Sequence, residues 1–269
     1  MCLIALAWRQ HPRYPLAIAA NRDELHARPT AAASLDPDAS TVYGGRDLVQ
    51  GGGWLQVSST GRLAAVTNVR DGLPDVALQP RSRGWLVRDF VRGQDTAEAY
   101  AATTAATGGH GPFNALFWDG RSLVHAGNHP AMHNAAVTPG IHAMSNGAFD
   151  APWPKSMLAT RALEAWLETP LATADPLDSP EALEPLFTAL ADTAIAPDAT
   201  LPDTGVGLAL ERRLSPPFVL AADYGTRCST VVLVARNHIL FAERRFGPAG
   251  VPAGDSLTVV PLQGIMDRS

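Results

Sequence analysis

The chain has 269 residues, of which 46% are apolar and 17% charged, with a net charge of −5. This composition supplies enough apolar material for a sizeable core and argues against extended disorder. The negative charge and the lack of any run rich in Lys or Arg exclude nucleic acid as the expected partner. No stretch approaches the length of a membrane-spanning helix, and no signal peptide is recognisable. We therefore expect a cytoplasmic protein with no integral membrane segment.

The first part of the chain predicts hairpins and then helices. Apolar runs at 2–8 and 15–20 flank the turn RQHPRY, so they predict a hairpin whose second strand ends directly in the tetrapeptide NRDE. A loop rich in Pro and Ala is expected to follow as far as about residue 42. The elements expected after it are a strand hairpin at 54–57 and 63–67, then helices at 84–92 and 94–106.

The second part of the chain returns twice to strands. Strand pairs are expected at 113–118 with 121–126, and at 131–138 with 141–146. The elements expected after them are helices at 153–168 and 179–193, a connection over 194–216, and strands at 217–222, 228–235 and 238–246. Strands joined by short turns predict antiparallel sheets, and no repeat or linker is visible. We expect one α+β domain over residues 1–269.

Cys2 is the first residue that suggests chemistry. Removal of Met1 would leave Cys2 with a free α-amino group beside its own thiol. An α-amine has an ordinary pKa near 8, which suits a general base at neutral pH, and a thiol within its reach is an activated nucleophile without any histidine. The alternative is a small apolar residue that opens a buried strand.

The tetrapeptide NRDE places four polar side chains at the end of an apolar strand. If this strand pairs with the first, the tetrapeptide lies near Cys2. Alternate residues of a strand share a face, so Asn21 and Asp23 are expected to point one way and Arg22 the other. Asp23 can then accept a hydrogen bond from the α-ammonium or thiol of Cys2, and Arg22 can stabilise negative charge. The alternative is an ordinary strand exit with surface ion pairs.

An N-terminal Met-Cys followed by ANRDELHARPT resembles the signature of the NRDE family, whose eukaryotic member is named for transport and Golgi organisation. Further similar blocks run in order along the chain: GGWL at 52–55, GRLAAVTN at 61–68, SRG at 82–84, FN at 113–114, MSNG at 144–147, PWPK at 152–155, YGTR at 224–227 and ERRF at 243–246. The chain is identified on these blocks as a member of that family.

The family in turn resembles N-terminal-nucleophile hydrolases of the penicillin V acylase and choloylglycine hydrolase type. This resemblance implies a four-layer αββα sandwich of two antiparallel sheets. It implies catalytic roles for Cys2, Asp23, Asn68, Asn146 and Arg227, with Asn68 helping to form an oxyanion hole. It also implies substrate binding by Asn21, Arg22 and Trp54. The chain departs from the acylases at Ala20, where they carry an arginine; Arg22, on the same strand face, is the nearby guanidinium.

Two functional hypotheses follow. The first is a cysteine N-terminal-nucleophile amidohydrolase acting on a small, non-peptide C–N bond, which requires no cofactor. The second is a non-catalytic protein of the same fold that binds or traffics haem or an acyl lipid. The partner is a small-molecule substrate or a hydrophobic ligand in either case. No metal site is expected, because the eight histidines show no HExxH pattern and the two cysteines are far apart.

Overall fold

The computed structural model describes residues 2–72, 81–106, 108–173 and 180–263, and these residues form two antiparallel β-sheets. The first sheet has the strand order β10 (Gly140–Met144), β1 (Cys2–Trp8), β2 (Leu16–Leu25), β11 (Tyr224–Val234), β12 (His238–Phe246), β13 (Pro252–Pro261). The second has the order β3 (Thr30–Asp36), β4 (Ala39–Asp47), β5 (Gly53–Ser58), β6 (Arg62–Asn68), β7 (Phe113–Trp118), β8 (Leu123–Gly127), β9 (His133–Ala136).

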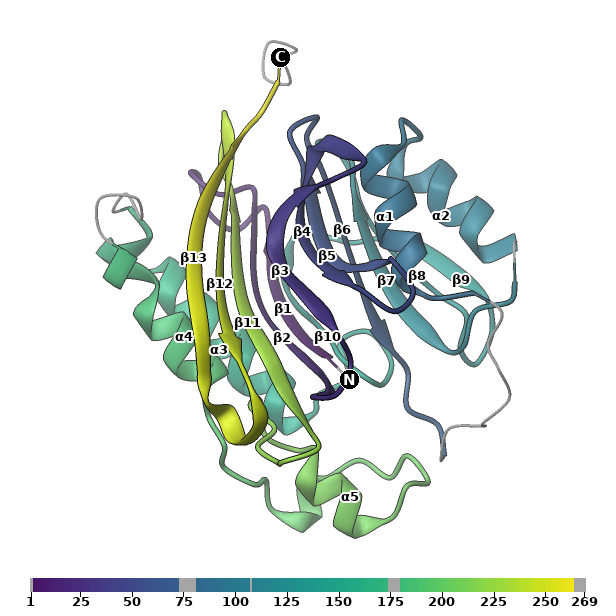
Figure 1. Ribbon diagram of the computed structural model, residues 1–269, viewed down its shortest axis with the longest axis vertical. Coiled ribbons are helices and arrows are strands. Elements are labelled where there is room, and N and C mark those ends of the chain that lie inside the picture. Colours follow the sequence, from purple (N-terminus) through teal and green to yellow (C-terminus); the bar gives the residue numbers. More distant parts are fainter. Residues whose placement is uncertain (1, 73–80, 107, 174–179, 264–269) are drawn as a thin grey trace.

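The two sheets pack face to face, and helices cover their outer faces (Figure 1). The five α-helices of the described residues are α1 (Gly84–Arg92), α2 (Ala97–Ala106), α3 (Pro154–Leu167), α4 (Glu184–Leu190) and α5 (Leu208–Arg213). Helices α3 and α4 pack on the first sheet, and α1 and α2 pack on the second. The predicted four-layer αββα sandwich is therefore confirmed.

Strand β1 shows how the sequence produces these layers. All seven of its residues are buried, and their side chains alternate between two cores. Ile4 and Leu6 point into the layer between the sheets, whereas Leu3 and Ala5 point toward α3. An uninterrupted apolar run is what a strand covered on both faces requires.

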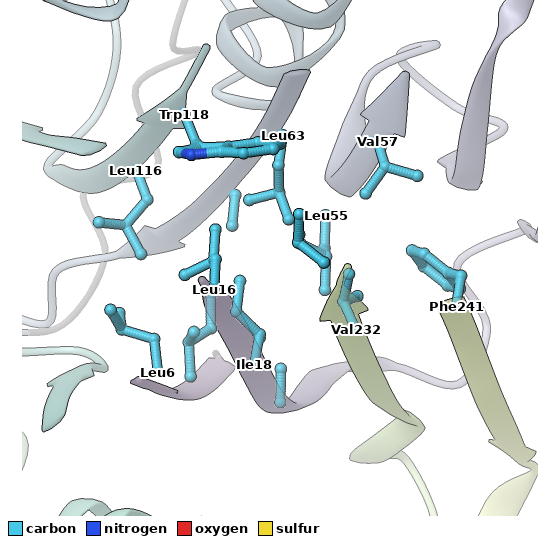
Figure 2. Close-up of a cluster of buried hydrophobic side chains, with 14 of the residues drawn as sticks. Leu6, Leu16, Ile18, Leu55, Val57, Leu63, Leu116, Trp118, Val232 and Phe241 are labelled. Atoms are coloured by element: carbon cyan, nitrogen blue, oxygen red, sulfur yellow. The ribbon is translucent and has the colours of Figure 1, made fainter. Parts of the chain in front are cut away.

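The inter-sheet layer is the largest apolar cluster among the described residues. Figure 2 shows Leu6, Leu16 and Ile18 of the first sheet facing Leu55 and Leu63 of the second. Burial of such side chains is worth roughly 1.5–3 kcal/mol each. The packing of the two sheets therefore supplies much of the stability, and it sets how their strand ends face one another.

Several expected elements differ in the structure. Strand β2 continues through the whole NRDE tetrapeptide to Leu25, and the loop expected up to residue 42 forms β3 and the beginning of β4. These two strands form an edge of their sheet, where partial exposure allows Pro- and Ala-rich sequence. Strand β13 was not predicted because most of its residues are partly or fully exposed, so it carries no apolar pattern.

Three further expectations are wrong. The strands expected at 131–138 and 141–146 do not pair: β9 joins β8 in the second sheet, whereas β10 joins β1 in the first. Segment 217–222 is not a strand, because Pro217 has no N–H and the next two N–H groups bond Asp192 and Thr226. The connection 194–216 contains α5, and residue 179 of the expected helix 179–193 lies outside the described residues.

The inter-sheet packing yields a stability prediction. Ile18→Ala removes a fully buried side chain between the sheets and should lower the free energy of unfolding by about 2–5 kcal/mol. Leu35→Ala, at an exposed position of edge strand β3, should change it by less than about 0.5 kcal/mol. Urea denaturation followed by circular dichroism measures both changes. Equal effects at the two positions would contradict the assignment of the core.

Candidate active site at the rim between the sheets

The hairpin of β1 and β2 brings Cys2 and the NRDE tetrapeptide together, as predicted. Cys2 lies directly opposite Arg22 in the antiparallel register, and both belong to the row of residues that faces the inter-sheet layer. Asn21 and Asp23 point to the other face of the sheet, where Asn21 donates to the carbonyl of Leu190, the last residue of α4, and to that of Pro217. The alternation expected for NRDE is therefore confirmed.

Cys2 opens into a pocket of about 320 Å³ at the rim between the two sheets. The first sheet contributes Cys2, Arg22, Asp23 and Glu24 to its lining. The facing wall comes from the second sheet and from the start of α1: Asp47, Gly52, Gly53, Trp54, Val66, Asn68, Ser82, Arg83 and Gly84. A concave site with a nucleophile and convergent polar groups has the form expected of a small-molecule site.

The Cys2 thiol is held largely away from solvent, with 8% of the residue exposed. Burial raises the pKa of this thiol above its ordinary value, and the charge of Asp23 raises it further. The nearby Arg22 guanidinium and the backbone N–H of Asp23, which donates to the sulfur, act in the opposite direction. The thiol therefore needs a base to become a nucleophile near neutral pH.

Asp23 is almost fully buried beside Cys2. Its Oδ1 accepts a 2.7 Å hydrogen bond from Thr226 Oγ1 on the adjacent strand β11. Burial raises the pKa of this carboxyl group, while the positive charge of Lys155 and the Thr226 hydroxyl oppose the rise. A carboxylate so placed can hold a cation next to the Cys2 backbone.

Two asparagines join the sheets next to this pocket. Asn68 ends β6 of the second sheet, and Asn146 follows β10 of the first. Asn146 Nδ2 donates to the Asn68 backbone oxygen at 2.9 Å and to Asn68 Oδ1 at 3.2 Å. Ser145 Oγ donates to the backbone oxygen of Cys2 at 2.9 Å, and Thr67 Oγ1 donates to the Ser145 carbonyl. The candidate nucleophile and both amides thus belong to one connected network.

The pocket has a strongly charged lining. Arg28 forms a bidentate pair with Asp47, with an Nε–Oδ1 distance of 3.1 Å. Arg83 donates to the Pro112 carbonyl, and within the described part of the chain neither Arg81 nor Arg83 has a carboxylate within ion-pair distance. Four arginines and three carboxylates line the pocket. Two of these arginines are therefore left to interact with a ligand.

Glycines allow α1 to start against this pocket. A Cβ added at Gly52 would lie 2.5 Å from the carbonyl carbon of Gly84, so the two backbones approach too closely for side chains. This contact explains the glycine directly before β5. It also places Ser82 and Arg83 at the pocket wall.

Comparison with known proteins identifies the family. The family model described as Transport and Golgi organisation 2 matches residues 1–248. The homologues from Bos taurus and Homo sapiens are each 30% identical to this chain, over 91% of the chain and 92% of the relative. The chain belongs to the Transport and Golgi organisation 2 family.

Solved structures share the fold at low sequence identity. The Caenorhabditis elegans N-acylethanolamine-hydrolyzing acid amidase ortholog superposes with a TM-score of 0.54 and 11% identity, covering 86% of this chain and 92% of that one. A single-residue variant of the conjugated bile acid hydrolase from Clostridium perfringens gives a TM-score of 0.51 at 6% identity, covering 97% and 92%. These neighbours are N-terminal-nucleophile hydrolases, so this family member has that fold.

Most of the residues expected in the site converge on it. Cys2, Arg22, Asp23, Trp54 and Asn68 line the pocket. Asn146 lies behind Asn68.

Asn21 and Arg227 are not among the residues that line this pocket. Asn21 donates to the Leu190 and Pro217 carbonyls and accepts from Ser229, so its amide joins the sheet to the α4 region. Arg227 donates to the carbonyls of Leu25, His26 and Arg28, and it thereby secures the turn after β2.

The structure adds residues that the sequence analysis did not assign. Lys155 lies buried behind the asparagines, Arg83 forms part of the pocket wall, and the Arg28–Asp47 pair lines it. Arg83 and Lys155 fall within the family blocks SRG and PWPK. Their place in these blocks was the one signal in the sequence that could have assigned them to the site. Neither block directly follows a strand predicted to end near Cys2, so the sequence alone did not place them there.

Within residues 2–72, 81–106, 108–173 and 180–263, no three His, Cys, Asp or Glu side chains are arranged to hold a metal ion. Among the same residues, no helix has the length and apolar character needed to cross a bilayer.

The raised pKa of the buried Cys2 thiol can be tested by titration. In protein that retains Met1, and therefore lacks the Cys2 α-amine as a base, we expect the rate of Cys2 alkylation by iodoacetamide to reach half its maximum above the ordinary thiol pKa of about 8.5, because the buried thiolate is poorly solvated. Mass spectrometry of the N-terminal peptide, over a series from neutral to alkaline pH, measures this midpoint. The Cys228→Ser variant removes the second thiol from the analysis. A midpoint below that ordinary value would contradict the electrostatic description.

Proposed function

We propose that this protein is an amidohydrolase that cleaves a small, non-peptide amide through Cys2. The observation that carries the proposal is the opening of the Cys2 thiol, at the start of a central strand, into a pocket shared with the Asn68 side chain. A nucleophile beside a neutral amide donor is the arrangement that acyl transfer needs. The enzymes named for amidase and bile acid hydrolase activity share this fold, which makes the reaction class chemically reasonable.

The first half of the proposed reaction forms a thioester. Once Met1 is removed, the Cys2 α-amine accepts the thiol proton as the sulfur attacks the amide carbonyl carbon. The carbonyl π electrons move to oxygen, and the Asn68 amide N–H stabilises the resulting oxyanion. The C–N bond then breaks, and the leaving amine takes the proton from the Cys2 ammonium.

The second half releases the acid. Water loses a proton to the Cys2 α-amine and attacks the thioester carbonyl, and collapse of the tetrahedral intermediate breaks the C–S bond. The thiolate regains the proton, which restores the enzyme. Asp23 holds the ammonium form of the amine, and Arg227 keeps the β2 turn in place through three backbone carbonyls.

The charges of the pocket indicate the substrate class. Arg81 and Arg83 line the wall without a carboxylate partner among the described residues, while the other two lining arginines are near Glu24 or Asp47. An arginine without a partner favours a planar anion such as a carboxylate. We therefore propose an amide that carries a carboxylate close to its scissile bond.

Replacement of the nucleophile gives the direct test. Cys2→Ala should abolish hydrolysis of the 7-amino-4-methylcoumarin amide of glutaric acid while the circular dichroism spectrum stays unchanged, because the only group that forms the thioester is lost. Cys228→Ser, at a buried cysteine outside the pocket lining, serves as the matched control and should remain active. Turnover by Cys2→Ala equal to wild type would rule out the mechanism.

Charge selectivity gives a second test. Arg83→Gln should lower kcat/KM for the glutaric amide by about tenfold or more, because a charged hydrogen bond is lost. The neutral pentanoic amide of the same coumarin should be affected much less. Arg236→Gln, at an exposed position beyond β11, is the control. Equal losses on both amides in the Arg83 variant would contradict an anionic substrate.

One observation favours a second function, the binding of haem or an acyl compound without turnover. Burial raises the pKa of the Cys2 thiol, which disfavours turnover where no base is at hand. The thiolate form of cysteine would be the group that holds haem iron here, and no His, Met or Tyr accompanies Cys2 among the described lining residues. A haem Soret band shifted by the wild type but not by Cys2→Ala, together with no amide turnover, would support this function over hydrolysis.

A further inference from the structure

Lys155 occupies a position that is costly for a cation. It is the second residue of α3, at the positive end of the helix dipole, and only 2% of it is exposed. Burial lowers the pKa of its ammonium group to about 8. The surrounding charges are Asp23 on β2, Cys2 on β1, Arg70 after β6 and Glu211 on α5. Buried titratable groups with a shifted pKa are concentrated at functional sites, so these surroundings suggest a functional role for Lys155.

The contacts of Lys155 are unusually restricted. Within the part of the chain that the structure describes, no carboxylate lies within ion-pair distance of its Nζ. Its one hydrogen bond among these residues runs from Nζ to Asn146 Oδ1, at 3.2 Å. The direct hydrogen bond of the Lys155 ammonium is therefore to an amide, whereas Asp23 interacts with it only through its charge.

Two hydrogen bonds determine which way the Asn146 amide faces: the one from Lys155 Nζ to its Oδ1, and the one from its Nδ2 to the Asn68 backbone carbonyl at 2.9 Å. An ammonium group can only donate, so it requires the oxygen of the amide and not the nitrogen. With Oδ1 on Lys155, the Asn146 NH₂ group faces Asn68 and donates to its Oδ1 at 3.2 Å. A reversed Asn146 amide would place N–H groups against the ammonium.

The orientation of the Asn146 amide in turn fixes that of the Asn68 amide. Because Asn68 Oδ1 accepts from Asn146, the Asn68 NH₂ group lies on the opposite side of that amide. Asn68 lines the pocket that contains Cys2. A reversed Asn68 would offer a carbonyl oxygen to a developing oxyanion and repel it.

We propose that Lys155 is a positioning residue that orients the Asn146–Asn68 amide pair so that an Asn68 N–H group is presented to the reacting carbonyl. The orientation is a property of the free protein, whereas its effect on catalysis rests on the proposed amidohydrolase function. Lys155 itself touches neither the substrate nor Cys2 in this role; it acts through Asn146.

Kinetics test the catalytic part with the glutaric coumarin amide. Lys155→Met should lower kcat by roughly 10²–10³-fold and leave KM within about threefold, because an interaction of the transition state is lost. Asn146→Ala should cause a similar loss, and the double variant should be no worse than Asn146→Ala alone. Losses that multiply in the double variant, or a change confined to KM, would overturn the proposal.

Two controls separate positioning from general destabilisation. Arg62→Met removes another buried cation, one that bonds the Phe90 and Asp95 carbonyls away from the pocket, and should leave kcat near the wild-type value. If Lys155→Met does not fold, Lys155→Leu replaces it in every measurement, because its side chain is also apolar and cannot donate a hydrogen bond to Asn146. A normal kcat in a folded Lys155→Leu variant would overturn the proposal.

A measurement that needs no turnover tests the orientation itself. The side-chain NH₂ resonances of ¹⁵N-asparagine-labelled protein are assigned to Asn68 and Asn146 by their loss in the Asn68→Ala and Asn146→Ala variants. Lys155→Met should shift or broaden both pairs of resonances, whereas Arg62→Met should not. Unchanged resonances in Lys155→Met would overturn the proposal. If the resonances move but the wild type hydrolyses no amide, the hydrolase function fails and the positioning role stands.

Discussion

The site depends on the packing of β1 in the interior of the first sheet. The strand lies between β10 and β2, and all of its residues from Cys2 to Trp8 are buried. The second residue of the chain is therefore as firmly held as a core residue, although chain ends are usually poorly ordered. A reactive group that uses its own α-amine as a base requires this constraint, because both groups must keep one geometry relative to the substrate.

The second requirement is that the two sheets end at the same rim. Cys2 and Asp23 belong to the first sheet, whereas Asn68 belongs to the second. The hydrogen bonds from Asn146 to Asn68, and from Ser145 to the Cys2 carbonyl, connect the residues at this rim. The apolar packing seen in Figure 2 thus has a functional consequence, since a shift of one sheet would separate the nucleophile from its amide donor.

The sequence predicted those parts of the fold and site that depend on local pattern. Cys2 and NRDE were correctly brought together because two apolar runs joined by a short turn leave little choice of register. Asn68 was found at a strand end by its place in a family block. Edge strands β3 and β13 were missed because partial exposure removes the apolar alternation that identifies a strand.

Other residues of the site could not be predicted from local pattern. Lys155 reaches Asn146 only because α3 packs across β1 and β10, a contact between elements. Arg227 belongs to the block YGTR at the start of β11, yet its guanidinium donates to backbone carbonyls at and after the end of β2. The direction of a long side chain depends on neighbours that are distant in sequence, so its role follows from the assembled fold.

The central claim is that Cys2 carries a free α-amine that activates its thiol. Intact-mass analysis of the protein purified from its native cell tests this claim most directly. We predict a mass smaller than that of the full sequence by one methionine residue, with Cys2 as the first residue in the N-terminal peptide. Retention of Met1 would remove the proposed base and contradict the self-activated nucleophile.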